Sequence, residues 1–318
     1  MVSEVRLPNA AVVAGSKIMK RAVSISLGSR ERDKKATLDV LGQSILVERI
    51  GTDGDVEQAA RLYRELDGQV DALGVGGLTL AVGTDRRHYP LRAAQKLVMG
   101  VRHTPVVDGT GLKDTLEYRA MRWVEQEIGS EISPKRAMNT SALDRYGMCK
   151  GLVEAGYDTV FCDLMFALGI PVPLKSLRQV EWLARVLAPV VMRLPISMIY
   201  PTGEKQHESV PKFARWYRWA SIVSGDCLYV KRHMPSDLGG KTVLTNTTTE
   251  ADVADFGRAG VRYLVTTTPR LDGRSFGTNM MEAALVAASG KGRPLSGAEL
   301  EAMIAELGWR PEILKLNG

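Results

Sequence analysis

Two hydroxyl-rich turns near the C-terminus carry the residues whose types and spacing best suit chemistry. The first, at residues 245–249, follows an apolar segment and precedes a helical pattern at residues 250–259. The second, at residues 266–278, follows the apolar segment 263–265 and opens another helix. Hydroxyl groups donate and accept hydrogen bonds, and a helix N-terminus offers free N–H groups and a positive dipole end. Together these features favour the binding of a small anion.

We expect the side chains of these turns to hold the anion. Two arginines supply planar guanidinium groups that suit a carboxylate or a phosphate, and the threonines orient its oxygen atoms. The predicted binding residues are Asn246, Thr247, Thr248, Thr267, Thr268, Arg270, Arg274, Ser275 and Asn279. Helix capping by Thr249 and Asp252 is the better explanation of the first turn taken alone. The second turn has about ten mostly polar residues, which is more than a connection between a strand and a helix needs.

Candidates for proton transfer stand at the ends of predicted strands. Lys205 is the first choice because polar residues 202–207 crowd around it after an apolar segment, and Asp108 is the second. Burial shifts the pKa of such groups toward neutrality, which general acid–base catalysis requires. A solvated turn is the alternative for Lys205, and a tight turn between strand and helix is the alternative for residues 108–113.

The spacing of the two turns predicts how their strands are arranged. A helical stretch separates the apolar segments 243–245 and 263–265, which favours a crossover connection between parallel neighbouring strands. Parallel strands place both turns at one edge of the sheet, where open α/β sheets bind ligands. Strands and helices alternate elsewhere too, so we predict two α/β domains with parallel or mixed sheets that face a shared cleft.

The length of 318 residues fits two domains. We predict an N-terminal extension at residues 1–19, an N-terminal α/β domain at 20–130 and a C-terminal α/β domain at 131–318 that carries the threonine-rich turns. Further expectations concern single elements: a hairpin at 36–50, strands at 195–200 and 227–230, an aromatic helix at 212–220, a buried helix at 280–288, and a capping box at 296–299 that opens the last helix.

Composition narrows the classes of function. The chain is 45% hydrophobic and 25% charged, as in soluble globular proteins, and no apolar run reaches the length of a membrane span. We therefore expect a cytoplasmic protein. A net charge of +6 favours anionic partners, but the basic segment 212–219 fits an amphipathic helix better than a nucleic-acid surface. Three distant cysteines and four histidines give no metal-ligand spacing. No G-x-G-x-x-G turn is present, which counts against a standard dinucleotide site.

Several of these segments resemble one known family. Residues 24–29, 48–55, 200–205, 245–249 and 266–279 are similar to those of a bacterial family that carries the name quinate 5-dehydrogenase. The resemblance extends over nearly the whole chain after the N-terminal extension. It implies hydride transfer between a nicotinamide cofactor, NAD(P), and a hydroxylated cyclic acid.

We therefore expect an enzyme that acts on a small anionic, oxygen-rich metabolite, with NAD(P)-dependent oxidation of quinate or shikimate type implied by the resemblance. Two alternatives remain. One is a transferase or lyase for a phosphorylated small molecule, with the same turns holding the phosphate. The other is a metabolite-binding protein without turnover, for which no titratable group would be buried in the cleft.

Overall fold

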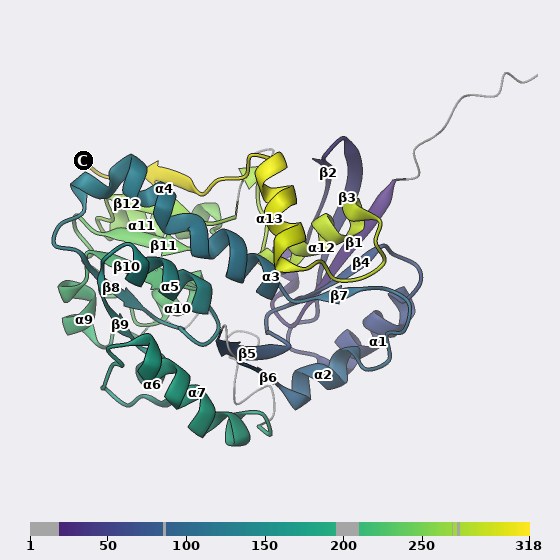
Figure 1. Cartoon of the computed structure of the whole chain (residues 1–318), viewed down its shortest axis with the longest axis horizontal. Helices are drawn as coiled ribbons and strands as arrows, with labels where there is room; N and C mark the ends of the chain where they lie inside the picture. The colour runs from purple at the N-terminus through teal and green to yellow at the C-terminus, as the bar shows by residue number, and fades with distance from the viewer. Residues whose placement is uncertain (1–18, 85–86, 195–209, 269, 272–273) are drawn as a thin grey trace, which may run out of the picture.

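The computed structural model describes residues 19–84, 87–194, 210–268, 270–271 and 274–318, without the side chains of residues 270, 271, 274 and 275. These residues form two main sheets that lie side by side, with helices packed on both (Figure 1). The α/β class predicted from the sequence is confirmed. No helix within the described ranges has the length and apolar character needed to cross a membrane.

The first sheet has the strand order β2-β3-β1-β4-β7. All neighbours are parallel except β2 and β3, which form the predicted hairpin. Helices α1 (Val56–Leu66) and α2 (Arg92–Val98) pack with its strands in one apolar core. The strands are β1 (Lys20–Ser26), β2 (Lys34–Val40), β3 (Gln43–Gly51), β4 (Ala72–Gly76) and β7 (Val106–Val107).

The second sheet has the order β9-β8-β10-β11-β12-β15 and is parallel except for β15 at its edge. Its strands are β8 (Arg136–Asn139), β9 (Asp158–Phe161), β10 (Ile222–Gly225), β11 (Thr242–Thr245), β12 (Tyr263–Thr266) and β15 (Glu312–Lys315). The two threonine-rich units are parallel neighbours, with Thr245 beside Thr266, as predicted. Both turns therefore leave the sheet at the same edge.

Helices surround the second sheet and connect its strands. They are α4 (Tyr118–Ile128), α5 (Tyr146–Glu154), α6 (Asp163–Leu168), α7 (Leu177–Val191), α9 (Ala214–Trp219), α10 (Cys227–Arg232) and α11 (Glu250–Arg258). Small hairpins complete the fold: β5 (Ala81–Thr84) with β6 (Arg87–Pro90), and β13 (Arg270–Leu271) with β14 (Arg274–Ser275).

The expected strand at residues 227–230 is wrong, because this segment begins helix α10. Asp226 caps the helix by accepting the backbone N–H of Leu228 at 3.0 Å. A short apolar run is typical of a strand and of a buried helix alike. The Asp at its start was the residue that indicated a helix, because Asp is a preferred N-cap. The strand expected at 195–200 lies outside the described residues.

The last helices return to the first sheet. Helix α12 (Thr278–Ser289) is apolar nearly all round and packs against β1, β3 and β4, which confirms the buried helix expected at 280–288. Helix α13 (Gly297–Glu306) opens with the predicted capping box of Ser296 and Glu299 and joins the same core. Figure 1 shows both yellow helices beside the purple strands, so the C-terminal residues complete the first core although we assigned 131–318 to one domain.

Each sheet reverses its strand order at one point. In the second sheet the order β9-β8-β10-β11-β12 places this point between β8 and β10. In the first sheet β1 has β3 on one side and β4 on the other, so the point lies between β1 and β4. Ligands of open α/β sheets bind at such points, beyond the C-terminal ends of the strands.

Candidate active-site cleft between the two sheets

A cavity of about 520 Å³ lies where the C-terminal ends of the two sheets meet, and we call it the cleft. The first sheet contributes the ends of β1 and β4, and the second contributes the turns after β8, β10 and β11. Both reversal points therefore open into one cavity. Its wall includes Ser24, Ser26, Arg49, Gly76, Asp108, Lys113, Asp144, Arg145, Asp226, Asn246, Thr247, Thr248, Thr278 and Asn279.

A π-helical turn at Lys113–Glu117 carries two charged side chains toward the cleft. It follows the short helix α3 (Thr110–Leu112) and runs directly into α4. Single π-turns are uncommon and frequently occur at functional sites. Both Lys113 and Glu117 are buried. Burial of a charged group costs free energy unless the group is paired with an opposite charge.

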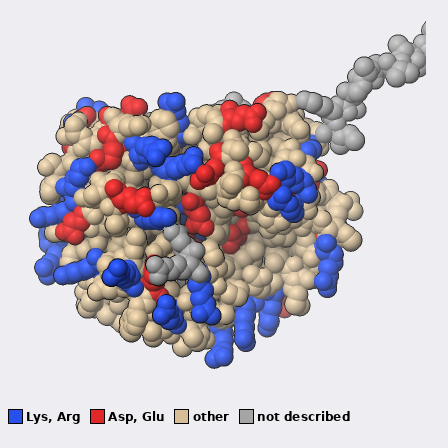
Figure 2. All heavy atoms as spheres, in the orientation of Figure 1, with Lys and Arg blue, Asp and Glu red and all other residues tan. Residues whose placement is uncertain are grey.

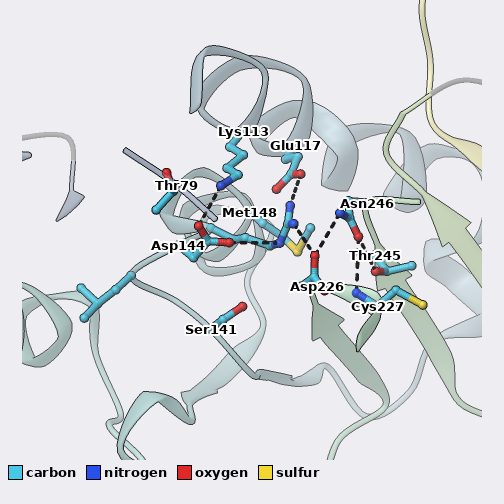
Figure 3. A network of polar contacts seen from close by, with 12 residues as sticks. Thr79, Lys113, Glu117, Ser141, Asp144, Met148, Asp226, Cys227, Thr245 and Asn246 are labelled. Carbon is cyan, nitrogen blue, oxygen red and sulfur yellow. Dashed lines mark hydrogen bonds and ion pairs between the residues drawn. The ribbon is translucent and has the colours of Figure 1, made fainter. Parts of the chain in front are cut away.

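Their partners, Asp144 and Arg145, come from the turn after β8. Lys113 Nζ lies 2.7 Å from Asp144 Oδ1, and the Arg145 guanidinium bonds Glu117. Arg145 also bonds Asp226 Oδ2 at 2.8 Å. Asn246 Nδ2 extends this chain of contacts by donating to the same Asp226 oxygen at 3.1 Å, as Figure 3 shows. The cluster therefore ties three strand-end turns to the π-turn.

The pKa directions show which members stay charged. Burial lowers the pKa of Lys113, but Asp144 and Asp108 together outweigh burial, so the pKa lies above its usual value. Burial raises the pKa of Asp144, but Lys113 and Arg145 bring it below the usual value. Burial also raises the pKa of Glu117, which Arg145 offsets only in part. Lys113 and Asp144 thus form a stable ion pair in the wall of the cleft, with side chains 7% and 25% exposed.

Asp108, predicted to move a proton, lies in the cleft wall but its carboxylate is already occupied. It accepts hydrogen bonds from Thr79 Oγ1 at 2.7 Å, from the Leu80 N–H at 2.6 Å and from the Thr110 N–H at 3.0 Å. Burial raises the pKa of Asp108, but Lys113 and these donors bring it below its usual value. This geometry favours a structural carboxylate that orders the turn before the π-helix.

The threonine-rich turns differ in what they offer the cleft. Thr247 and Thr248 are half-buried in its wall, and their hydroxyls make no hydrogen bond to any described residue. Thr267 and Thr268 are fully buried and do not line the cleft. The Thr268 hydroxyl donates to the Asn246 carbonyl at 2.7 Å, which orders the neighbouring turn. Thr247 and Thr248 of the first turn thus face the cleft, whereas the second turn reaches it only through Gly277 and Thr278 among the residues whose side chains are described.

Asn246 and Thr249 have structural partners as well. The Asn246 amide oxygen accepts from Thr245 Oγ1 at 3.1 Å and from the Cys227 N–H at 3.3 Å. Thr249 and Asp252 form a capping box at the start of α11, as expected for this turn. At the start of α11 the Asp252 carboxylate thus accepts the Thr249 N–H at 2.8 Å, and the Thr249 hydroxyl accepts the Asp252 N–H at 3.2 Å.

The start of α12 enters the cleft from the first sheet. Asn279 Nδ2 donates to Ser24 Oγ at 2.5 Å, which places Asn279 in the cleft wall as predicted for a binding residue. Helix α12 begins close to the backbone at Gly109, where a side chain would not fit. A Cβ on Gly109, whose φ is +89°, would lie 2.6 Å from Thr278 Oγ1. Gly277 precedes the helix and provides no side-chain cap, and the first turn of α12 has no acidic residue.

The side chains of four predicted site residues lie outside the described part of the structure. Lys205 lies outside the described residues. Arg270, Arg274 and Ser275 contribute backbone to the β13–β14 hairpin, but their side chains lie outside the described part of the chain. Their roles in anion binding stay predictions.

The sequence reasoning missed the charged cluster itself. It did not connect Lys113, Glu117 and Arg145 with Asp144 and Asp226. Asp226 stands directly before the segment 227–230, which we expected to be a strand, so the sequence did not show that it follows β10. The convergence of these side chains depends on the strand order, which the sequence does not state.

Family models divide the chain near the cleft. A model described as domain of unknown function (DUF8754) matches residues 111–316, more than half of the chain. The chain belongs to the DUF8754 family. A second model, domain of unknown function (DUF8753), matches residues 21–108. The two matches meet at the turn of Asp108, Gly109 and Thr110, which lies between β7 and the π-turn.

Comparison with known proteins adds no named relative. No curated protein matches the chain. Among solved structures, the NAD-dependent malic enzyme of Thermotoga maritima is 11% identical, with 90% of this chain and 76% of that chain covered and a TM-score of 0.38. The glucose-galactose binding protein GanP of Geobacillus stearothermophilus is 10% identical, with 94% and 98% covered and a TM-score of 0.35. A Mycobacterium smegmatis protein in complex with β-D-fucofuranose is 11% identical, with 93% and 91% covered and a TM-score of 0.35.

Proposed function

We propose that the chain is an enzyme that binds a small anionic, oxygen-rich metabolite in the cleft and transfers a proton to or from it through Lys113. One observation carries this proposal. The Lys113 ammonium is buried and held 2.7 Å from Asp144 in the wall of a cavity where the strand-order reversals of two parallel sheets meet. Buried, charge-coupled groups in a cavity are features of functional sites.

One part of the wall suits an oxygen-rich anion, while the carboxylates of Glu31, Asp33, Glu250 and Asp252 line other parts of it. The Thr247 and Thr248 hydroxyls are available to hydrogen-bond hydroxyl or carboxylate oxygens of a ligand. Opposite them, the Arg49 guanidinium is kept in place by Asp33 at 2.6 Å and by Ser26 Oγ at 2.9 Å. An ammonium, a guanidinium and neutral hydroxyls together suit a hydroxylated acid better than an apolar or cationic compound.

The pair of Lys113 and Asp144 has a defined part in such chemistry. Lys113 would donate a proton, or a hydrogen bond, to an oxygen of the substrate that becomes negative. Asp144 would hold the ammonium in position, and Arg145 would hold Asp144 and Asp226. Lys113 replaces Asp108 as the proposed proton carrier, because the Asp108 carboxylate already has three donors.

The first turn of the second sheet does not fit the diphosphate of a nicotinamide dinucleotide. A dinucleotide-binding turn directs free backbone N–H groups at the diphosphate. Here the Ser141 N–H bonds Asn139 Oδ1 at 2.9 Å, and the N–H groups of Ala142 and Leu143 bond Asp163 at 3.2 and 3.0 Å. NAD(P)-dependent oxidation thus stays a prediction of the family resemblance, and we derive no step through the cofactor.

Binding without turnover is the second candidate, and one observation favours it. The pKa of Lys113 lies above its usual value, so its proton is held tightly in the ligand-free protein. Such an ammonium is a good anion ligand even where no proton moves. An anionic ligand would raise the Lys113 pKa further, so proton transfer in an enzyme of this design requires negative charge to build up on the accepting oxygen of the substrate.

A ligand panel followed by a turnover assay tests the proposal. Thermal unfolding would be measured with quinate, shikimate, other hydroxylated acids, phosphorylated sugars and NAD(P)H, for the wild type, Lys113→Met and the exposed control Lys96→Met. We expect a hydroxylated acid at about 100 times its Kd to stabilise the wild type and Lys96→Met by about 2–3 kcal/mol, and Lys113→Met much less. Chemical conversion of that acid by the wild type alone supports an enzyme. Binding without conversion supports the second candidate, and no stabilisation by any acid contradicts both.

A further inference from the structure

A second hollow lies at the opposite end of the second sheet, where β8, β10, β11 and β12 begin. We call it the basal pocket; its volume is about 260 Å³. The cleft and the basal pocket are separated by the length of these four-residue strands. Several Lys and Arg side chains lie over the neighbouring helix α9, at the left of Figure 2. The wall of the basal pocket includes Arg136, Arg218, Lys241, Arg262, Glu131 and Trp219.

Positive charge exceeds negative charge in this wall. Glu131 is its only described carboxylate, and it is engaged by the Arg262 guanidinium and by the Tyr263 hydroxyl at 2.9 Å. Arg136, Arg218 and Lys241 form no ion pair with any described residue. Three cations thus surround one small hollow without a carboxylate to balance them.

Lys241 is the cation held most firmly. Its ammonium donates to the carbonyls of Arg218 at 3.0 Å and Ala220 at 2.7 Å, which cap the end of α9. Two of its three N–H bonds are thereby used, and one is left for a further acceptor. Burial lowers the pKa of Lys241 and Asp237 offsets this only in part, so a bound anion would favour its charged form.

The Trp219 ring in the wall of the basal pocket is already in contact with two other side chains, so it does not offer a free face on which a ligand could stack. The Arg136 guanidinium lies 5.5 Å from the centre of the Trp219 ring, and Trp216 meets the same ring edge-on at 5.7 Å. The indole therefore orients Arg136 by a cation–π contact. What the pocket presents to a ligand is a set of positively charged donors.

We propose that the basal pocket is a second ligand site, which binds a small multivalent oxyanion such as inorganic phosphate or the phosphate group of a small ester. The planar guanidinium groups of Arg136 and Arg218 and the point charge of Lys241 match phosphate oxygens. The pocket is built from residues that the cleft does not use. The proposal for the basal pocket therefore does not depend on the function proposed for the cleft.

Calorimetric titration of the full chain tests the proposal, with inorganic phosphate in one arm and glycerol 3-phosphate in the other, at constant ionic strength. Arg218→Gln removes a donor that forms no ion pair with a described residue, Arg136→Gln also removes the cation–π contact with Trp219, and Lys241→Met removes the central charge. Lys113→Met reports on the cleft, and Lys96→Met controls for the loss of a surface charge. We expect the arginine variants to bind at least about tenfold more weakly than the wild type, and both lysine variants outside the pocket to bind normally.

The two arms identify the form of the ligand. Tighter binding of the ester assigns the pocket to a phosphorylated metabolite, and equal or weaker binding assigns it to free phosphate. Absence of binding in both arms overturns the proposal. So does binding that Lys113→Met abolishes and the arginine variants leave unchanged, because the anion would then occupy the cleft.

Discussion

Lys113 and Asp144 meet at 2.7 Å although they belong to different connections: Lys113 to the turn after the first sheet, and Asp144 to the turn after β8 of the second. This ion pair joins the two sheets at the cavity into which both strand-order reversals open. The pair therefore has a structural role and a proposed chemical one.

Replacement of Lys113 by Met should destabilise the protein, because it leaves the Asp144 carboxylate without its main partner. We expect a loss of about 3 kcal/mol, the lower end for a buried pair, since Asp144 is 25% exposed and keeps Arg145 nearby. Denaturant unfolding of Lys113→Met measures the loss. The exposed Lys96→Met should change stability by less than about 0.5 kcal/mol. Equal midpoints for the two variants would show that the ion pair contributes nothing.

Two threonine variants separate a hydroxyl that lines the cleft from a buried hydroxyl that does not. Thr247→Val should weaken ligand binding about tenfold and leave stability nearly unchanged, because its hydroxyl faces the cleft without a described partner. Thr267→Val should leave binding unchanged and be neutral or slightly stabilising, since its buried hydroxyl also lacks a partner. The Kd of each variant for the ligand found in the panel decides the matter. The reverse ranking would restore the second turn as the binding element.

The contact between Gly109 and the start of α12 can be tested by comparing two glycine-to-alanine variants. Gly109→Ala places a methyl group 2.6 Å from Thr278 Oγ1 and 2.7 Å from the Asn279 nitrogen, at a φ of +89°. Gly42→Ala has a similar φ of +73° but nothing within 4 Å. We expect about 1 kcal/mol of destabilisation for Gly42→Ala, and about 2 kcal/mol more for Gly109→Ala because α12 must move. Similar urea midpoints for both variants would mean that α12 does not depend on this approach.

Glu282 gives the stability a pH dependence. Burial, together with Asp108, raises the pKa of Glu282 from its usual 4.5 to about 8, and its Oε2 accepts the Gly111 N–H at 3.1 Å. The folded state therefore holds this proton more tightly than the unfolded state. The resulting stability is complete below about pH 4.5 and is lost as the pH rises to about 8.

Glu282→Gln keeps a neutral acceptor at every pH. We expect the variant to exceed the wild type in stability above about pH 8, by up to roughly 5 kcal/mol, and to match it as the pH falls toward 4.5. Thermal unfolding across this range measures the difference. A stability difference that does not change with pH would show that Glu282 is already ionised in the folded protein.

Local patterns in the sequence were sufficient for much of the fold. The spacing of the threonine-rich units predicted the parallel pair β11–β12, and the all-round apolar pattern predicted the burial of α12. Ser296 and Glu299 marked the start of α13. Each of these features depends on residues close together in the chain, so it can be predicted from a single sequence.

The features that depend on distant contacts were not predicted. The return of α12 to the first sheet depends on close approach to Gly74, Gly76 and Gly109, which no local pattern reveals. The edge strand β15 was also missed, and its antiparallel pairing with β12 joins residues about 50 positions apart in the chain. Arg145 joins Glu117 and Asp226 only after the second sheet has folded, and the π-turn that presents Glu117 has no known sequence pattern here.

A crystal structure of the complex with the acid that stabilises the protein most would test the cleft directly. The ligand should lie between the ends of β1 and β4 and the turns after β8, β10 and β11, with an oxygen within hydrogen-bond distance of Lys113 Nζ. A ligand bound elsewhere, with the Lys113–Asp144 pair and the Thr247 hydroxyl untouched, would contradict the proposed function.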